Sequence, residues 1–331
     1  MKYFVMSDIH GDYPAMMQGL KESGYNKKDP NHQIIVIGDY FGRATVGKGP
    51  YGIFKYLTSK THVNKPICIK GNHEEWFVKP MLERGYVSEL DCWNGEDKTI
   101  YSFFEHIPHI NDKDFNMQPV YDYLTKHPVA VAFEDRFSVG IMDEEVAAIN
   151  MFGQGKQLKK WLDEMPYYFE TEHYVFTHGW LPYRITETKK ISNRAEDYAQ
   201  DPIEAQELYR KAYVENSKMT YKYHEMDLHS DKQWHYWIWV KTPEEYELHK
   251  RYYPNGWDKW IVVGHWHAFA FGPRAEFFQE QYWDKYDIHP EEFNYVVDEQ
   301  HKVIFCDHCT VYGHKINVLV IEDNLEDKSI V

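Results

Sequence analysis

Seven residues that follow short apolar runs are of kinds that bind divalent metal ions: Asp8, His10, Asp39, Asn72, His178, His265 and His267. Carboxylate, imidazole and amide oxygen donors suit ions such as manganese, iron and zinc. Two such ions, held about 3.5–4 Å apart, can clamp a phosphate ester and lower the pKa of a bridging water. One carboxylate must then lie between the ions and serve both. These seven donors are of the types that a two-metal site acting on a phosphate ester would need.

The spacing of the donors supports this interpretation. Asp8 and His10 are two residues apart, as are His265 and His267, so an extended chain directs each pair to one side. Each motif alone has an ordinary structural explanation, such as a cap, a turn or a hydrogen-bonded histidine. Their joint occurrence at five places in the chain favours the metal site.

Each candidate ligand follows a short apolar run, and these runs cover residues 2–6, 33–37, 66–69, 173–176 and 260–263. Such runs predict buried strands, and the intervening polar stretches of helical length predict βαβ units. Loops at the carboxyl ends of these strands are where α/β sheets place ligands. Helices are expected over residues 14–23 and 75–84, and residues 302–307 and 315–322 predict a terminal β-hairpin or meander.

The composition limits the classes of function. The 37 basic and 52 acidic residues give a net charge of −15, which disfavours binding to duplex nucleic acid. An anionic substrate stays possible, because bound metal reverses the local charge. Four cysteines do not form a disulfide framework, and no apolar run approaches the roughly 18 residues of a membrane helix. We expect a soluble, cytoplasmic protein that does not bind membranes.

The distribution of the candidate ligands bears on domain organisation. Length alone favours two domains, but the candidate site draws on residues from 8 to 267. We therefore expect a single catalytic domain over residues 1–331, with inserted helical or loop segments at about 86–135 and 185–235. The sequence does not predict the oligomeric state.

The motifs resemble those of the calcineurin-like metallophosphoesterases: Asp8-Ile9-His10-Gly11, Gly38-Asp39-Tyr40-Phe41-Gly42-Arg43, Gly71-Asn72-His73-Glu74, Thr177-His178-Gly179 and Gly264-His265-Trp266-His267. Bacterial serine/threonine protein phosphatases and symmetrical diadenosine tetraphosphate hydrolases are the most similar branches. A closing segment at 306–315 extends the resemblance over nearly the whole chain. It implies an α/β fold, a four-layer α/β/β/α sandwich of two mixed sheets with helical insertions.

The resemblance also implies roles for the site residues. One metal ion would be held by Asp8, His10, Asp39 and His267, and the other by Asp39, Asn72, His178 and His265. The implied catalytic residues are His73, Asp39 and Arg43, with His73 as general acid, and the implied substrate-binding residues are Arg43, Asn72 and His73. Manganese is the expected metal, with iron or zinc as alternatives.

Two departures from the phosphatase pattern bear on the chemistry. Gly42 stands where that branch has an aspartate that orients the general-acid histidine, and Glu74 and Asp12 are the motif residues that could supply the carboxylate instead. Restoring it as Gly42→Asp is expected to raise activity on alkyl phosphates, provided that the backbone accepts a side chain there. Lys70 stands where many relatives have arginine.

The expected function is hydrolysis of phosphomonoesters, including phosphoserine and phosphothreonine of proteins, by direct attack of a hydroxide that bridges the metals. The partner would thus be a phosphoprotein or a small phosphoester. Hydrolysis of dinucleoside polyphosphates, whose two charged ends could use Lys70 and the 185–235 insertion, or of phosphodiesters is the alternative within the class. A non-catalytic interaction module stabilised by metal is the alternative from another class.

Overall fold

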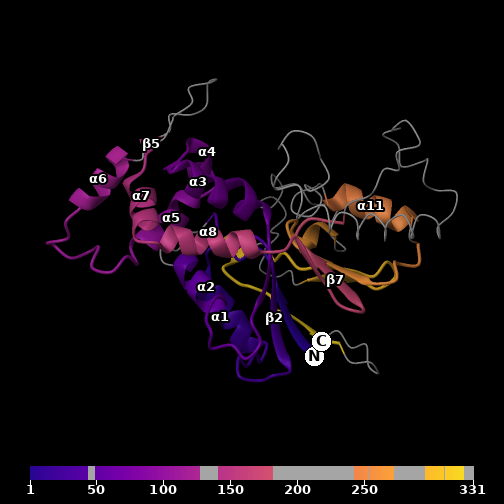
Figure 1. The fold of residues 1–331 in the computed structure, drawn as a ribbon. Helices are drawn as coiled ribbons and strands as arrows, with labels where there is room; N and C mark the ends of the chain where they lie inside the picture. The colour runs from indigo at the N-terminus through magenta and orange to yellow at the C-terminus, as the bar shows by residue number, and fades with distance from the viewer. Residues whose placement is uncertain are drawn as a thin grey trace.

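The structure is a computed structural model that describes residues 1–43, 49–126, 141–181, 242–252, 254–271, 295–308 and 310–323. Two mixed sheets form its centre (Figure 1). The first sheet has the strand order β11-β1-β2-β3: β1 (Lys2–Met6), β2 (His32–Ile37), β3 (Ile67–Ile69) and β11 (Leu319–Glu322). Strands β1, β2 and β3 are parallel, and β11 pairs antiparallel with β1.

The second sheet has the order β6-β7-β8-β10-β9: β6 (Tyr168–Glu170), β7 (Tyr174–Thr177), β8 (Trp260–Val263), β9 (Val296–Asp298) and β10 (Val303–Phe305). Its three central strands are parallel, and both edge strands are antiparallel. The expected terminal hairpin is wrong, because β10 and β11 belong to different sheets. A two-stranded ribbon, β4 (Tyr86–Val87) with β5 (Ile141–Met142), lies apart from both sheets.

Alternating side chains of the strands define the layers. On β1, Phe4 packs toward the helices, whereas Val5 packs against the second sheet. On β8, Val262 lies in that same cluster between the sheets, and Val263 packs on the opposite face with α11 (Thr242–Tyr252) and the 3₁₀ turn η3 (Ala268–Phe271). The chain thus builds four layers, which confirms the predicted α/β/β/α sandwich.

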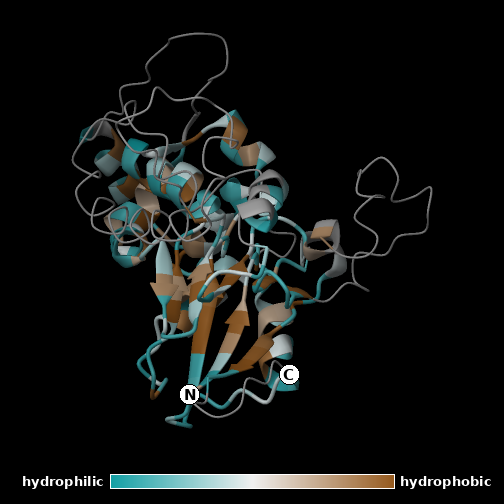
Figure 2. Ribbon diagram, turned by 90° about the vertical axis from the view of Figure 1, so that its right-hand side faces the viewer, coloured by the Kyte–Doolittle hydropathy of each residue, from teal (hydrophilic) through white to brown (hydrophobic). Residues whose placement is uncertain are grey.

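The helices of the described chain are mostly collected on the outer side of the first sheet, and α11 lies across the second (Figure 1). They are α1 (Tyr13–Glu22), α2 (Gly49–Leu57), the π-helical turn η1 (Glu74–Val78), α3 (Lys79–Arg84), α4 (Glu89–Trp93), α5 (Glu96–Phe104), α6 (Gln118–Lys126), α7 (Glu144–Met151), α8 (Gln154–Glu164) and the short α13 (Thr310–Gly313). Figure 2 shows hydrophobic strands inside and helices that mix hydrophobic and hydrophilic residues.

Local sequence explains the helices beside the site. Helix α1 begins where the Asp12 carboxylate accepts the Ala15 N–H at 2.9 Å, with Pro14 in its first turn, as the sequence predicts. The expected helix over 75–84 ends at Gly85, in the left-handed conformation, but its first half is π-helical. Pro80 lacks the N–H that would continue a regular ladder through this stretch.

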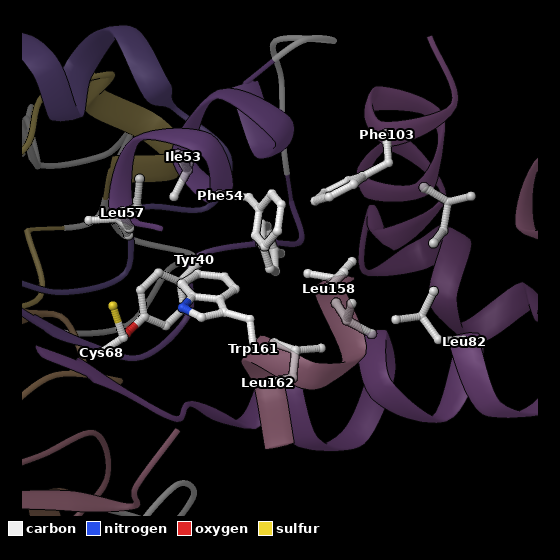
Figure 3. Close-up of a cluster of buried hydrophobic side chains, with 14 of the residues drawn as sticks. Tyr40, Ile53, Phe54, Leu57, Cys68, Leu82, Phe103, Leu158, Trp161 and Leu162 are labelled. Atoms are coloured by element: carbon white, nitrogen blue, oxygen red, sulfur yellow. The ribbon is translucent and has the colours of Figure 1, made fainter. Parts of the chain in front are cut away.

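The described part of the expected insertion at 86–135 holds strand β4, helices α4, α5 and α6 and the loops between them, and α5 packs through Phe103 into the hydrophobic cluster around Trp161. Trp161 of α8 lies in the middle of this cluster of buried hydrophobic side chains (Figure 3). The centroid of its ring is 5.3 Å from that of Tyr40 and 5.4 Å from that of Phe54. The Phe103 ring lies 5.3 Å from Phe54. The second expected insertion, 185–235, lies outside the described residues.

Within the described residues, no helix is long and apolar enough to cross a membrane.

Candidate metal centre

The candidate ligands lie where strands of both sheets end, which brings together residues that are far apart in the sequence: Asp8 and His10 after β1, Asp39 after β2, Asn72 after β3, His178 after β7, and His265 and His267 after β8. Two hydrogen bonds join the sheets at this edge. The His178 Nδ1–H donates to the Ile37 carbonyl at 2.9 Å, and the His265 N–H donates to Asp8 Oδ2 at 3.0 Å. The two sheets therefore meet at the edge where the seven predicted donors follow the strands.

Asp39 lies close to donors from both sheets. It belongs to two groups of side chains whose ligand atoms lie within 4.8 Å of one another, one with His10 and His73 and the other with His178 and His265. Asp39 Oδ2 is 3.9 Å from His10 Nε2 and 3.8 Å from His73 Nε2, and Oδ1 is 3.3 Å from His178 Nε2. One carboxylate thus faces two sites with a different oxygen each.

The second group has donor chemistry that fits a divalent cation. Because Ile37 O accepts the proton on His178 Nδ1, the other ring nitrogen, Nε2, faces Asn72 Oδ1 at 3.0 Å and Asp39 Oδ1 at 3.3 Å. A nitrogen can face two oxygens at these distances when it carries a proton or when a cation lies among the three atoms. Oxygen and imidazole nitrogen together suit a borderline divalent ion.

The first group is oriented in the same way. The His10 Nδ1–H donates to the Phe41 carbonyl at 3.0 Å, which leaves Nε2 free to face the carboxylates. Asp8 Oδ1 lies 3.9 Å from that Nε2. His267 belongs to neither group. Its Nδ1 lies 2.9 Å from Asp307 Oδ2, and this hydrogen bond directs Nε2 away from Asp307.

The backbone at this edge is strained. The non-glycine residues with positive φ include Asp8 at 52°, His10 at 47°, Asp39 at 51°, Arg43 at 48° and His265 at 67°. L-residues rarely occupy this left-handed region, and such strain persists where surrounding structure imposes it. Backbone strain is concentrated on the predicted site residues. The fold therefore accepts this strain in order to hold these side chains in fixed directions.

Burial and neighbouring charges shift the pKa of the site groups strongly. Burial raises the pKa of Asp8 to about 8, with repulsion from Asp307 adding to it. Burial lowers the pKa of His265 to about 3, and the nearby His178 contributes. For His178, burial opposes the charged ring, but Asp39 and Asp8 outweigh it and raise its pKa to about 10. The carboxylates of Asp39 and Asp8 therefore stabilise positive charge at the position of His178.

Glu74 and Asp12, the residues expected to supply a carboxylate to His73, do not do so. The Glu74 carboxylate accepts the backbone N–H groups of Asp39 at 2.9 Å and Tyr40 at 3.0 Å, and so holds the loop after β2. Asp12 caps α1 and accepts from His314 Nδ1 at 3.0 Å. That expectation is wrong for both residues, because each carboxylate is occupied elsewhere.

The structure brings a different carboxylate to His73, which sequence reasoning missed. Glu96, the first residue of α5, lies with Oε1 2.6 Å from His73 Nδ1, and both side chains are buried. In the sequence, Glu96 looks like an ordinary acidic residue in the first turn of a helix. Only the docking of α5 against the loop after β2 places it at the site, so no local signal identifies it.

The two basic residues that the sequence singled out have different environments. Arg43 is exposed and its N–H donates to the Asn94 carbonyl at 2.5 Å. Burial and the charge of His73 lower the pKa of His10, and the Arg43 guanidinium lowers it further. The positive charge of Arg43 therefore lies near the candidate metal ligands. Lys70 is 1% exposed, and its Nζ is 2.8 Å from Glu75 Oε2 and lies over the Tyr167 ring. The contact of Lys70 with substrate that the alternative function uses is not supported, because the charge of Lys70 is neutralised inside the protein.

The chain is similar to several solved phosphatase structures, at low sequence identity. No curated protein matches the sequence. Among solved structures, the chain is similar to a cold-active protein-tyrosine phosphatase of a psychrophilic Shewanella species, at 14% identity and a TM-score of 0.42, over 98% of this chain and 76% of that one. A protein serine/threonine phosphatase from Saccharomyces cerevisiae matches at 13% identity and a TM-score of 0.46, over 97% of this chain and 72% of that one.

A metallophosphoesterase from Sphaerobacter thermophilus matches at 14% identity and a TM-score of 0.34, over 98% of this chain and 84% of that one. Likenesses of this degree carry no argument about the substrate. The family model of the calcineurin-like phosphoesterases, however, matches residues 1–269, a range that contains all seven candidate ligands. With two mixed sheets and metal-binding side chains at their strand ends, the chain therefore belongs to the calcineurin-like phosphoesterase family of metal-dependent hydrolases.

Proposed function

We propose that this protein hydrolyses phosphomonoesters, with phosphoserine and phosphothreonine side chains as its substrate class, at a centre of two divalent metal ions. The observation that carries the proposal is that Asp39 directs Oδ2 toward His10 and His73 and Oδ1 toward His178. A carboxylate placed between two donor groups is what a dinuclear site requires.

The proposed ligands are those that the family resemblance implies. Asp8, His10 and His267 would bind one ion, Asn72, His178 and His265 would bind the other, and Asp39 would bind both. Manganese is the proposed metal. Two such ions supply positive charge for the phosphoryl oxygens and lower the pKa of a bound water.

The remaining residues act on the ester itself. Arg43 would bind two phosphoryl oxygens, since a guanidinium presents two parallel N–H groups to an oxyanion. His73 would hold a proton at Nε2 and donate it to the leaving oxygen as the P–O bond breaks. Nε2 also faces Asp39, so His73 could instead be a metal ligand. Metal content of His73→Asn separates the two roles: an unchanged content supports proton donation.

Monoesters are favoured over dinucleoside polyphosphates for a specific reason. The dianion of a monoester uses the exposed Arg43 together with the metal ions. A dinucleoside polyphosphate would need a second basic contact for its far end, and Lys70 is buried against Glu75. The described residues thus favour the smaller anionic group.

The test is a substrate comparison with protein reconstituted with manganese, iron or zinc. Initial rates are measured on a phosphoserine peptide, p-nitrophenyl phosphate, bis-p-nitrophenyl phosphate and diadenosine tetraphosphate. The variant Asp39→Asn should lose activity on all of them, whereas Asp114→Asn, at an exposed position, should match the wild type. A higher kcat/KM for diadenosine tetraphosphate or the diester than for the monoesters would contradict the proposed substrate class.

A further inference from the structure

Helix α5 carries a line of buried polar side chains, of which the first, Glu96, contacts the candidate site. Glu96, Thr99 and Ser102 are spaced three residues apart, and all are fully buried. The His73 Nδ1–H donates to Glu96 Oε1 at 2.6 Å, and the Thr99 hydroxyl donates to Glu96 Oε2 at 3.2 Å. Both carboxylate oxygens are therefore held in place, so Glu96 cannot rotate away from the histidine ring without losing a bond.

Glycine at position 42 leaves the space for this contact. A Cβ atom on Gly42 would lie 2.2 Å from His73 Nδ1 and 2.4 Å from Glu96 Oε1, and the φ angle of 73° adds strain for any other residue. The residue at 42 cannot carry a side chain while Glu96 and His73 stay in contact. The contact between Glu96 and His73 therefore requires glycine at position 42.

The helix that carries Glu96 is fixed to the loop that carries Arg43. The Arg43 N–H donates to the Asn94 carbonyl directly before α5, and the Tyr51 N–H donates to the Ser102 hydroxyl at 3.1 Å. Phe103 adds apolar packing against Phe54 of α2. A group on such an element is held more firmly than one on a free loop.

We infer that Glu96 is the positioning residue for proton donation by His73, an inference that rests on the proposed function. The carboxylate keeps the Nδ1 proton in place, so that the second proton of the imidazolium is at Nε2, on the side of Asp39. That proton moves to the leaving oxygen as the P–O bond breaks, and the neutral ring keeps its Nδ1–H. Glu96 accepts the Nδ1–H bond throughout and stabilises the charged ring.

The experiment measures kcat/KM of the metal-loaded protein on β-glycerophosphate, whose alkoxide needs a proton, and on p-nitrophenyl phosphate, whose phenolate does not. Glu96→Gln keeps a hydrogen-bond acceptor but removes the charge, and Glu96→Asp keeps the charge on a shorter chain. We expect Glu96→Gln to lose about 10²–10³-fold on the alkyl ester and less than about tenfold on the aryl ester. Glu96→Asp should recover part of the alkyl activity.

Two further variants make the result specific. Ser102→Ala removes another buried polar contact of α5 and should lower thermal stability without changing the ratio of the two rates. His73→Asn should show the same selective loss as Glu96→Gln, and the double variant should lose no more than His73→Asn alone. Metal content should equal the wild-type value in every variant.

The outcomes separate this inference from the proposed function. If His73→Asn is selective for the alkyl ester but the Glu96 variants lose both activities equally, or only stability, Glu96 is structural and the inference is overturned. If His73→Asn itself shows no selectivity, the proposed role of His73 fails and the inference fails with it. Should Glu96→Gln not fold, Glu96→Asp gives the decision by the same ratio.

Discussion

At the scale of single residues, the candidate site depends on a few side chains whose hydrogen bonds determine where they point. His10 and His178 each donate Nδ1–H to a backbone carbonyl, of Phe41 and Ile37, so both Nε2 atoms are directed at Asp39. These carbonyls belong to the segment around the end of β2. The same stretch of backbone thus supplies the shared carboxylate and orients two of the imidazoles around it.

Replacing Arg43 should affect monoesters more than diesters. A charge-assisted bidentate contact contributes about 1.5–3 kcal/mol, so Arg43→Ala should lower kcat/KM for p-nitrophenyl phosphate by about 10–100-fold. The loss on bis-p-nitrophenyl phosphate should be smaller, because a diester monoanion offers less charge. Lys98→Ala, on the exposed side of α5, controls for the loss of one positive charge. An equal loss on both substrates would mean that Arg43 does not bind the phosphoryl group.

Substitution of Gly42 should damage the protein rather than improve it. The condition for a gain in Gly42→Asp is not met, because φ is 73° and a Cβ would collide with His73 and Glu96. We expect Gly42→Ala to lower the free energy of unfolding by about 1–3 kcal/mol and to lower activity on alkyl phosphates. Gly24→Ala is the matched control, since Gly24 has φ of 77° but no atom within 4 Å of the Cβ position. Urea denaturation showing equal losses for both variants would argue against the collision.

The sequence predicts the candidate metal ligands of the site, but not the residues around them that hold or orient the site side chains. Asp8, His10 and Asp39 follow strands that their apolar runs reveal, and the parallel strand order then gathers them. Glu96 could not be predicted, because its contact with His73 depends on how α5 docks. The burial of Lys70 was equally hidden, since its partner Glu75 lies in the π-helical turn.

At the scale of secondary structure, local patterns predict elements well and their partners less well. The run at 260–263 is strand β8 as expected. The strands near the carboxyl end are also real, but β10 pairs with β8 and β11 pairs with β1. Which sheet a strand joins depends on the tertiary fold, and a hydrophobic run in the sequence does not predict it.

Helix α11 offers a test of how one element is attached to the second sheet. His249 of α11 donates Nε2–H to the His301 carbonyl at 3.0 Å, and burial lowers the pKa of its ring to about 4. The unfolded chain binds a proton near pH 6.5, so between pH 6.5 and 4 it binds more protons than the folded protein, and this contribution to stability is lost as the pH falls.

The expected result is that the wild type loses about 2 kcal/mol more than His249→Gln between pH 7 and pH 5. Glutamine keeps a donor for the His301 carbonyl but does not titrate. Urea denaturation of the metal-loaded protein at both pH values measures the difference, with His109→Gln on an exposed turn as the control. Parallel pH dependence in wild type and His249→Gln would show that His249 is not buried in its neutral form.

At the scale of the whole molecule, the helices between β3 and β6 share one hydrophobic cluster with the first sheet. Trp161 and Phe103 lie in it together with Phe4 of β1. We therefore propose that the described parts of residues 1–181 unfold together, in line with the expected single domain. Replacing Trp161 by Ala should cost about 3–5 kcal/mol and shift the whole transition.

Thermal unfolding followed by circular dichroism and by intrinsic fluorescence tests this cooperativity. The two signals should give one midpoint in the wild type and one lower midpoint in Trp161→Ala. Trp93→Ala, with a side chain that is largely exposed, should change stability by less than about 0.5 kcal/mol. Two separate midpoints in the wild type would indicate that the helical segment and the sandwich are independent domains.

The central claim is that Asp39 binds two metal ions at once, and electron paramagnetic resonance of the manganese-reconstituted protein tests it most directly. Two manganese ions bridged by one carboxylate are magnetically coupled, so the spectrum should show an exchange-coupled pair, with two metal ions per chain by elemental analysis. Asp39→Asn should lose the coupled signal and at least one ion, whereas Asp114→Asn should keep both. A wild-type protein that binds a single uncoupled ion, or a coupled pair that persists in Asp39→Asn, would contradict the account.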